Sequence, residues 1–177
     1  MAIVYTLGHS NRSFEDFLAI LQAHRIETLV DIRSFPASRK WPWFNRESLE
    51  RALPAAGIEY FWKKELGGRR KKLRADSPNT GLHEPGFRNY ADYMMTAEFR
   101  RGIEEVIALA EKKRTAVMCA EALYYRCHRM LVSDWLTAHG HTVLHLASAT
   151  AGPKPHKPVA EFTVEDGQLI YRGGGLF

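Results

Sequence analysis

Five short apolar runs, separated by segments with helical periodicity, constrain the fold of this chain more than any other feature. Each run has five or six residues, which is too short for a helix, and most of them stop at a glycine or a polar residue. This alternation is typical of a parallel sheet whose strands are joined by helical crossovers. The expected strands are residues 3–7, 27–32, 58–62, 115–119 and 142–146.

The segments between these runs predict helices. Ser13 is a typical N-cap, because Asp16 follows it in the first turn and apolar residues then recur at helical spacing. Gly140 marks a helix C-terminus, and Pro54 is expected to end or bend its helix. The expected helices are residues 13–24, 46–56, 87–95, 98–113 and 127–139.

The C-terminal part of the chain differs in composition from the rest. Three prolines between residues 153 and 158 predict a stiff linker, and Asp166-Gly167 is a typical hairpin turn. We therefore expect a single-domain α/β protein with a mostly parallel central sheet of about five strands flanked by helices. The expected parts are the α/β domain at 1–149, the proline-rich linker at 150–159, and a C-terminal hairpin and tail at 160–177.

Composition narrows the classes of function. The 177 residues contain no apolar run of the length that a membrane span requires, and the N-terminus lacks the pattern of a secretory leader, so we expect a cytoplasmic protein. The 25 Lys and Arg residues exceed the 20 Asp and Glu residues, which favours an anionic ligand such as a nucleic acid or a nucleotide. Neither a Walker loop nor a GxGxxG motif is present, and no cofactor is expected.

Polar residues follow several of the expected strands. Ligands of open parallel α/β sheets bind outside the carboxyl ends of the strands, where the loops converge. The predicted site therefore combines residues that follow the first, second and fourth strands. These residues are His9, Ser10, Asn11, Asp31, Arg33, Cys119 and Glu121.

The stretch from Cys119 to Arg129, CAEALYYRCHR, carries the sharpest chemical signal. A thiol at a strand end, close to a helix N-terminus and to arginines, is expected to have a lowered pKa and to act as a nucleophile. We predict that Cys119, Glu121 and His9 are catalytic. Substrate binding is predicted for Asp31, Arg33, Arg126, His128, Arg129, Ser10 and Asn11.

The same residues also fit structural roles. Cys119 fits an inert core thiol, Asp31 a structural ion pair or helix cap, and His9 a loop histidine that the backbone satisfies. A zinc site is not expected, because the spacing between Cys119 and Cys127 differs from that of zinc knuckles, and adjacent residues on a helix diverge.

Aromatic and basic residues alternate in two further stretches. This combination is typical of surfaces that hold single-stranded or flipped bases, although tryptophans in proline-rich loops also cap cores, and charged runs are often solvated. No helix-turn-helix, zinc-finger or RNA-recognition signature accompanies them. The predicted nucleic-acid surface consists of Arg39, Lys40, Trp41, Trp43, Arg69, Arg70, Lys71 and Lys72.

Six separated blocks of the sequence resemble one family. They are Thr6 to Ser10, Val30 to Pro36, Phe44-Asn45, Glu65 to Gly68, Phe87 to Met94, and Cys119 to Glu121 together with Cys127 to Arg129. In this order, over roughly residues 3–146, the chain is similar to the family called domain of unknown function 488. The resemblance implies a small bacterial or archaeal α/β protein with signature residues at the strand ends, and it implies no particular reaction.

Three functions fit these observations. The leading hypothesis is a hydrolase or group transferase that acts on a nucleic-acid base, a nucleotide or another phosphate-bearing substrate at the rim of the sheet. The alternative is a non-catalytic, basic nucleic-acid binding module. A weaker alternative is a thiol redox sensor that uses Cys119 and Cys127.

Overall fold

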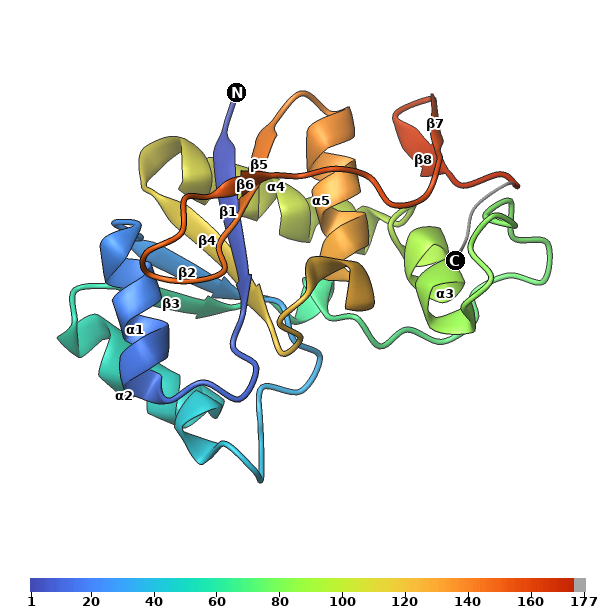
Figure 1. Ribbon diagram of the computed structural model, residues 1–177. Helices are drawn as coiled ribbons and strands as arrows, with labels where there is room; N and C mark the ends of the chain where they lie inside the picture. Colours follow the sequence, from blue (N-terminus) through green and yellow to red (C-terminus); the bar gives the residue numbers. More distant parts are fainter. Residues whose placement is uncertain (174–177) are drawn as a thin grey trace.

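A six-stranded sheet forms the centre of the protein in the computed structural model, which describes residues 1–173 (Figure 1). The strands β1 (Ile3–Gly8), β2 (Thr28–Asp31), β3 (Glu59–Trp62), β4 (Thr115–Cys119) and β5 (Thr142–His145) run parallel. The short β6 (Lys154–Pro155) adds antiparallel to β5, and the strand order is β3-β2-β4-β1-β5-β6. The predicted fold class is confirmed.

The strand order brings distant parts of the sequence together at one edge of the sheet. β4 lies between β1 and β2, with Gly8 opposite Cys119 and Asp31 opposite Met118. Since these strands are parallel, their carboxyl ends lie side by side, and the loops that follow them leave from the same edge.

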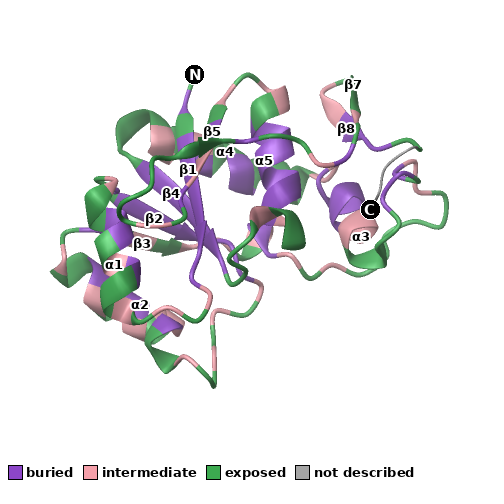
Figure 2. Cartoon of the chain, in the orientation of Figure 1, coloured by how far each residue is buried: buried purple, intermediate pink, exposed green. Residues whose placement is uncertain are grey.

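Helices cover both faces of the sheet (Figure 1). One face carries α1 (Phe14–Ala23) and α2 (Arg46–Ala55), which contribute Phe17 and Leu49 to the core on that side. The other face carries α4 (Ala97–Lys112) and α5 (Arg129–Ala138), and α3 (Pro85–Tyr93) packs against α5 beside them. These helices contribute Phe99, Leu131 and Tyr90 to the core on that side. Figure 2 shows the buried residues concentrated in the sheet and on the inner sides of these helices.

Local signals account for the helix boundaries. The Ser13 side chain accepts the Asp16 backbone N–H at 3.1 Å, and Thr96 caps α4 in the same way through Phe99. Pro54 lies in the last turn of α2, which ends one residue later. Three 3₁₀ turns complete the domain: η1 (Pro42–Phe44), η2 (Lys64–Leu66) and η3 (Tyr124–Arg126).

The C-terminal segment returns to the domain and packs on it. The expected linker contains β6, and the predicted hairpin is present as β7 (Thr163–Glu165) and β8 (Gln168–Ile170). Asp166 and Gly167 have φ angles of 50° and 76°, which is the left-handed backbone that this type of turn requires. Residues 174–177 of the predicted tail lie outside the described part. Within residues 1–173, no helix combines the length and apolar character needed to span a bilayer.

Candidate functional site

A pocket of about 590 Å³ opens at the carboxyl edge of the sheet. Its walls come from the loop after β2, the segment after η2, the start of α3, and the loop between β4 and α5. The volume lies in the range of small-molecule binding sites. The lining residues are Arg33, Ser34, Phe35, Ala37, Gly68, Arg69, Glu84, Gly86, Phe87, Cys119, Ala120, Glu121, Arg126, Cys127 and His128.

Two free thiols lie together in this pocket. Cys119 is the last residue of β4 and is 2% exposed, and Cys127 precedes α5 and is half-buried. Their Sγ atoms are 2.9 Å apart, and the Cys119 Sγ lies 3.5 Å from the Glu121 carbonyl oxygen. The loop between β4 and α5 therefore folds back so that the two sulfurs are in direct contact.

Arg129 lies directly behind the two thiols. Its side chain is 1% exposed, and its Nη2 donates to the carbonyls of Glu121 and Ala122 at 3.1 and 2.9 Å. Its backbone N–H faces the Cys127 Sγ at 3.4 Å. In residues 1–173, its Nε is the one buried side-chain nitrogen or oxygen without a hydrogen-bond partner, and no carboxylate there pairs with it. A buried cation without a carboxylate favours a thiolate nearby.

The pKa values of the two thiols consequently shift in opposite directions. Burial by itself would raise the pKa of Cys119, but the hydrogen bond from Cys127 and the Arg129 charge bring that pKa below its ordinary value. The hydrogen bond with Cys119, burial and the charge of the Cys119 thiolate raise the pKa of Cys127 well above its ordinary value. Of the two sulfurs, Cys119 is therefore the one whose environment favours the thiolate, with the Cys127 thiol as its hydrogen-bond donor.

The open side of the pocket carries exposed charged and aromatic groups. Glu121 and Arg126 are exposed on the loop that follows β4. Across the pocket, the Arg69 guanidinium lies 5.5 Å from the centre of the Phe35 ring, which is 67% exposed. In the described residues, neither Arg69 nor Arg126 forms an ion pair. Both arginines are therefore available to an anionic ligand.

Asp31 and Arg33 form a buried ion pair beneath the pocket. The Arg33 Nε and Nη2 donate to the two Asp31 oxygens at 2.9 and 2.6 Å, and the Tyr60 hydroxyl donates to Oδ2 at 2.5 Å. The Arg33 Nη1 lies 3.3 Å from the His9 Nε2, and the His9 Nδ1 lies 2.8 Å from the Ser10 carbonyl oxygen. The Asp31 carboxylate is thus neutralised inside the protein, while part of Arg33 still lines the pocket.

Two predicted site histidines are neutral at physiological pH. Burial lowers the pKa of His9 to about 4, and burial likewise lowers the pKa of His128 to about 4. The His128 Nε2 lies 2.8 Å from the Ile32 carbonyl oxygen, so the ring holds the end of β2 as a neutral donor.

The structure brings together part of the predicted set. Of the predicted catalytic residues, Cys119 and Glu121 line the pocket, and of the predicted binding residues, Arg33, Arg126 and His128 do so. The others lie behind or beside this pocket in the described part of the chain. These are His9, Ser10, Asn11, Asp31 and Arg129.

Sequence reasoning missed the role of two glycines, which allow segments of the site to pack closely against each other. A Cβ at Gly8 would lie 1.6 Å from the Glu121 carbonyl oxygen, so this glycine lets the loop cross the end of β1. A Cβ at Gly68 would lie 2.4 Å from the His128 Nδ1, so the basic segment can approach α5 only through glycine. Gly8 precedes the predicted site residue His9, and Gly68 precedes Arg69 of the predicted nucleic-acid surface. These neighbours were the signal in the sequence that could have indicated a role for the two glycines.

The predicted nucleic-acid surface divides into two parts that meet at Arg69. The Arg69 backbone N–H donates to the Ser34 hydroxyl at 2.8 Å, and this bond joins the segment after η2 to the loop after β2. Trp41 packs its ring edge against His9, and the Trp43 indole donates to the Arg12 carbonyl. Exposed side chains in the two parts are Arg39, Lys40, Trp43, Arg69, Lys71 and Lys72, while Trp41 and Arg70 are half-buried.

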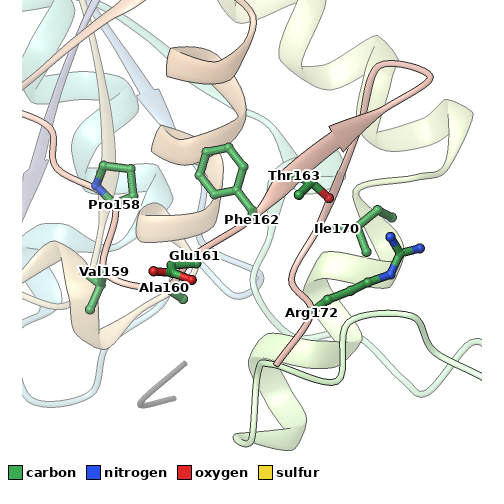
Figure 3. Close-up of a pocket in the computed structure, with 8 residues that line it drawn as sticks. All are labelled: Pro158, Val159, Ala160, Glu161, Phe162, Thr163, Ile170 and Arg172. Carbon is green, nitrogen blue, oxygen red and sulfur yellow. The ribbon is translucent and has the colours of Figure 1, made fainter. Parts of the chain in front are cut away.

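A second pocket, of about 450 Å³, lies in the C-terminal segment (Figure 3). Apolar side chains such as Val159, Phe162 and Ile170 line it, with Glu161 and Arg172 at its edges. Its walls contain neither a thiol nor a histidine, and no predicted site residue reaches it. The rim pocket is therefore the candidate site. Among the described residues, no group of three or more His, Cys, Asp or Glu side chains gathers as metal ligands.

The geometry defines a class: an α/β protein with a paired thiol site at the carboxyl edge of its sheet. The chain belongs to the family described as Domain of unknown function DUF488, whose model matches residues 13–136. The resemblance inferred from the sequence blocks is confirmed over this range, which includes both cysteines. No curated protein and no solved structure matches the chain.

Proposed function

We propose that the protein is a cytoplasmic hydrolase or group transferase that uses Cys119 as a covalent nucleophile on a phosphate-bearing substrate, a nucleotide or nucleic acid. One observation carries the proposal: the Cys119 thiol lines an open pocket, and behind it lies a buried arginine for which residues 1–173 provide no carboxylate partner. That environment favours the thiolate, which is the reactive form of cysteine.

Cys119, Glu121 and Arg129 have distinct roles in this reaction. The Cys119 thiolate attacks an electrophilic carbon or phosphorus atom, and the bond to the leaving group breaks. The Glu121 carboxyl, exposed at the pocket wall, exchanges a proton with the leaving group and then with the water or acceptor that releases the enzyme. Arg129 lies outside the pocket lining and acts through Cys119, so it is a positioning residue.

The remaining groups support an anionic substrate with a planar part. Arg69 and Arg126 have exposed guanidinium groups that suit bidentate contact with a phosphate. The exposed Phe35 ring next to Arg69 offers a flat apolar face of the kind on which bases stack. Charge and stacking on one wall favour a nucleotide or nucleic acid over a simple carboxylate.

The test is to trap the covalent intermediate. The reduced protein is incubated with a panel of nucleotides and short oligonucleotides, quenched in acid, and weighed by intact mass spectrometry. We expect an adduct on Cys119 that accumulates in Glu121→Gln, because proton transfer in the release step is slowed.

The matched controls are Cys119→Ser and Glu84→Gln, which removes a second carboxylate from the same pocket wall. Cys119→Ser should form no adduct, and Glu84→Gln should leave the amount of adduct as in the parent protein. Turnover of any panel member that survives in Cys119→Ser contradicts the proposal, because the nucleophile would then be another group.

The second candidate function is nucleic-acid binding without catalysis. It is favoured by the exposed, irregular segment that contains Lys71 and Lys72, for which the described residues provide no ion pair. A solvated cation of this kind neutralises backbone phosphate and releases counterions.

Salt dependence distinguishes the two functions. If the protein is a binder, its affinity for single-stranded DNA or RNA falls steeply with salt. The double variant Lys71→Ala and Lys72→Ala should then lower the slope by about 1.4, since each phosphate contact on a single strand contributes roughly 0.7. Cys119→Ala should leave the slope unchanged. A slope that stays the same in the double variant rules out this binding surface.

A further inference from the structure

We propose that Cys119 and Cys127 form a reversible disulfide, a modification site that switches off the thiolate chemistry of the rim pocket. The proposal goes beyond the function above, since it depends on the two sulfurs and not on the identity of a substrate. The sulfurs are 2.9 Å apart, so a bond of about 2.05 Å needs a movement of under one ångström.

The pocket gives a small oxidant access to both sulfurs. Cys119 and Cys127 both line the rim pocket, and its volume of about 590 Å³ lies in the range of pockets that hold small molecules, so one tripeptide half of a small disulfide can enter it. The oxidant we assign is a low-molecular-weight disulfide such as oxidised glutathione, whose carboxylates match the exposed Arg69 and Arg126. Anionic thiols are the common redox partners of cytoplasmic proteins.

The exchange proceeds in two balanced steps. In the first, the Cys119 thiolate attacks one sulfur of the small disulfide, forms a mixed disulfide and expels a thiolate. In the second, Cys127 loses its proton and attacks the Cys119 sulfur, which forms the internal disulfide and expels the second thiolate. Starting from the Cys119 thiolate and the Cys127 thiol, the protein loses two electrons and one proton, and the oxidant becomes one small thiol and one small thiolate.

The first step prepares Cys127 for the second. While Cys119 is a thiolate, its hydrogen bond and its negative charge hold the pKa of Cys127 high. The mixed disulfide removes that charge, whereas the Arg129 guanidinium and its backbone N–H, 3.4 Å from the Cys127 sulfur, remain in place. Two of the three causes that raise the pKa of Cys127 are then gone, while Arg129 still lowers it, so Cys127 becomes the attacking group after Cys119 has reacted.

Oxidation would also change the loop that shapes the pocket. Cys127 lies between η3, which carries Arg126, and the start of α5. A covalent link to β4 ties this loop to the sheet and removes the nucleophile at the same time. The disulfide form is therefore expected to take up no substrate on Cys119, and reduction restores it.

The test is a redox titration of the full chain in glutathione buffers of increasing oxidised fraction. Free thiols are alkylated after an acid quench, and the protein is digested with trypsin. Trypsin cleaves after Arg114, Arg126 and Arg129, so an internal disulfide joins peptides 115–126 and 127–129. We expect this joined pair to appear in a single two-electron step and to disappear on addition of dithiothreitol.

A Cys127→Ser variant gives the matched comparison. It should stop at the mixed disulfide and carry one glutathione on Cys119, whereas the parent protein carries none at equilibrium. Two free thiols, or a persistent glutathione adduct in the parent protein over the whole titration, would overturn the proposal. The covalent trapping test above uses reduced protein and no oxidant, so it succeeds or fails independently of this titration.

Discussion

At the scale of single residues, Arg129 has the largest effect on the environment of the two thiols. It begins α5, yet its guanidinium is turned under the loop after β4, where it bonds two carbonyls and keeps one donor unpaired. No carboxylate of the described residues pairs with it, and its charge lowers the pKa of Cys119. Asp31 and Arg33 represent the opposite case, because each of them is neutralised by the other.

Replacement of Arg129 should make Cys119 less acidic. In Arg129→Met, the buried charge that lowers the pKa of Cys119 is lost, so the midpoint of iodoacetamide alkylation of Cys119 against pH should move upward. Alkylation at pH 7 should slow by about tenfold.

The control for this prediction is Arg126→Met, which removes an exposed arginine from the same loop. Solvent screens that charge, so the midpoint should change much less. Equal shifts in the two variants would show that the burial of Arg129 has no special effect on the thiol.

Asp31→Asn should be strongly destabilising. It leaves the Arg33 charge buried without its carboxylate, which typically costs about 3–5 kcal/mol. The exposed pair of Arg46 and Glu50 provides the control, since Glu50→Gln should leave the free energy of unfolding nearly unchanged. Urea unfolding measures both, and similar losses in the two variants would contradict the assigned role of the buried pair.

At the scale of elements, the C-terminal segment supports the loop that carries Cys127. Tyr124 in η3 stacks on His145 with ring centres 3.9 Å apart, and its hydroxyl donates to the Lys157 carbonyl at 3.1 Å. His145 in turn lies 2.9 Å from His156, which pairs with Asp134 in α5 at 2.7 Å. This chain of contacts joins β5, α5 and the segment after β6 to one side of the site.

Removal of His156 should loosen this loop selectively. In His156→Ala, the contacts to His145 and Asp134 are lost, so hydrogen exchange of the amides in residues 120–128 should accelerate by about tenfold or more under native conditions. The measurement is hydrogen exchange followed by mass spectrometry.

Leu53→Ala provides the matched control. It removes a fully buried side chain from α2 on the opposite face of the sheet, with an expected loss of about 2–5 kcal/mol. Exchange in residues 120–128 should then stay close to that of the parent protein. If both variants accelerate the loop equally, the effect is a loss of global stability and the C-terminal segment does not hold the loop.

At the scale of the whole molecule, buried neutral histidines make the stability depend on pH. Burial lowers the pKa of His9 and of His128 to about 4, and of His145 to about 3, while each histidine titrates near 6.5 when unfolded. Between these values the unfolded chain binds more protons than the folded one. The free energy of unfolding therefore rises with pH over this window, and stability is lost as the pH falls from about 6.5 to 4.

The pH dependence should be visible in urea unfolding at pH 7 and pH 5. Each of the three histidines contributes up to about 1.4 kcal/mol per pH unit within the window. Burial raises the pKa of Asp134, which acts in the opposite direction and reduces the effect at the acidic end. His128→Gln keeps a donor for the Ile32 carbonyl and should lower the slope by roughly one third. A slope that is unchanged in this variant would contradict a neutral, buried His128.

The sequence by itself determined the local elements and indicated the stretches of chain that form the candidate site. Ser13, Gly140 and Asp166-Gly167 act on neighbouring backbone, so their caps and turns could be predicted from pattern alone. The polar residues after the strands indicated the rim, because the carboxyl ends of parallel strands meet at one edge of the sheet. Cys119 and Glu121 do line the pocket there.

Only the tertiary structure decided which of these residues face the pocket. The placement of β4 between β1 and β2 brings Gly8 against Cys119 and turns His9 and Asp31 inward, toward Arg33. The burial of Arg129 and the pairing of β6 with β5 depend on segments distant in the sequence. Charge and spacing are properties of the sequence, but burial is a property of packing, and burial decides whether an arginine faces solvent or changes the acidity of a thiol.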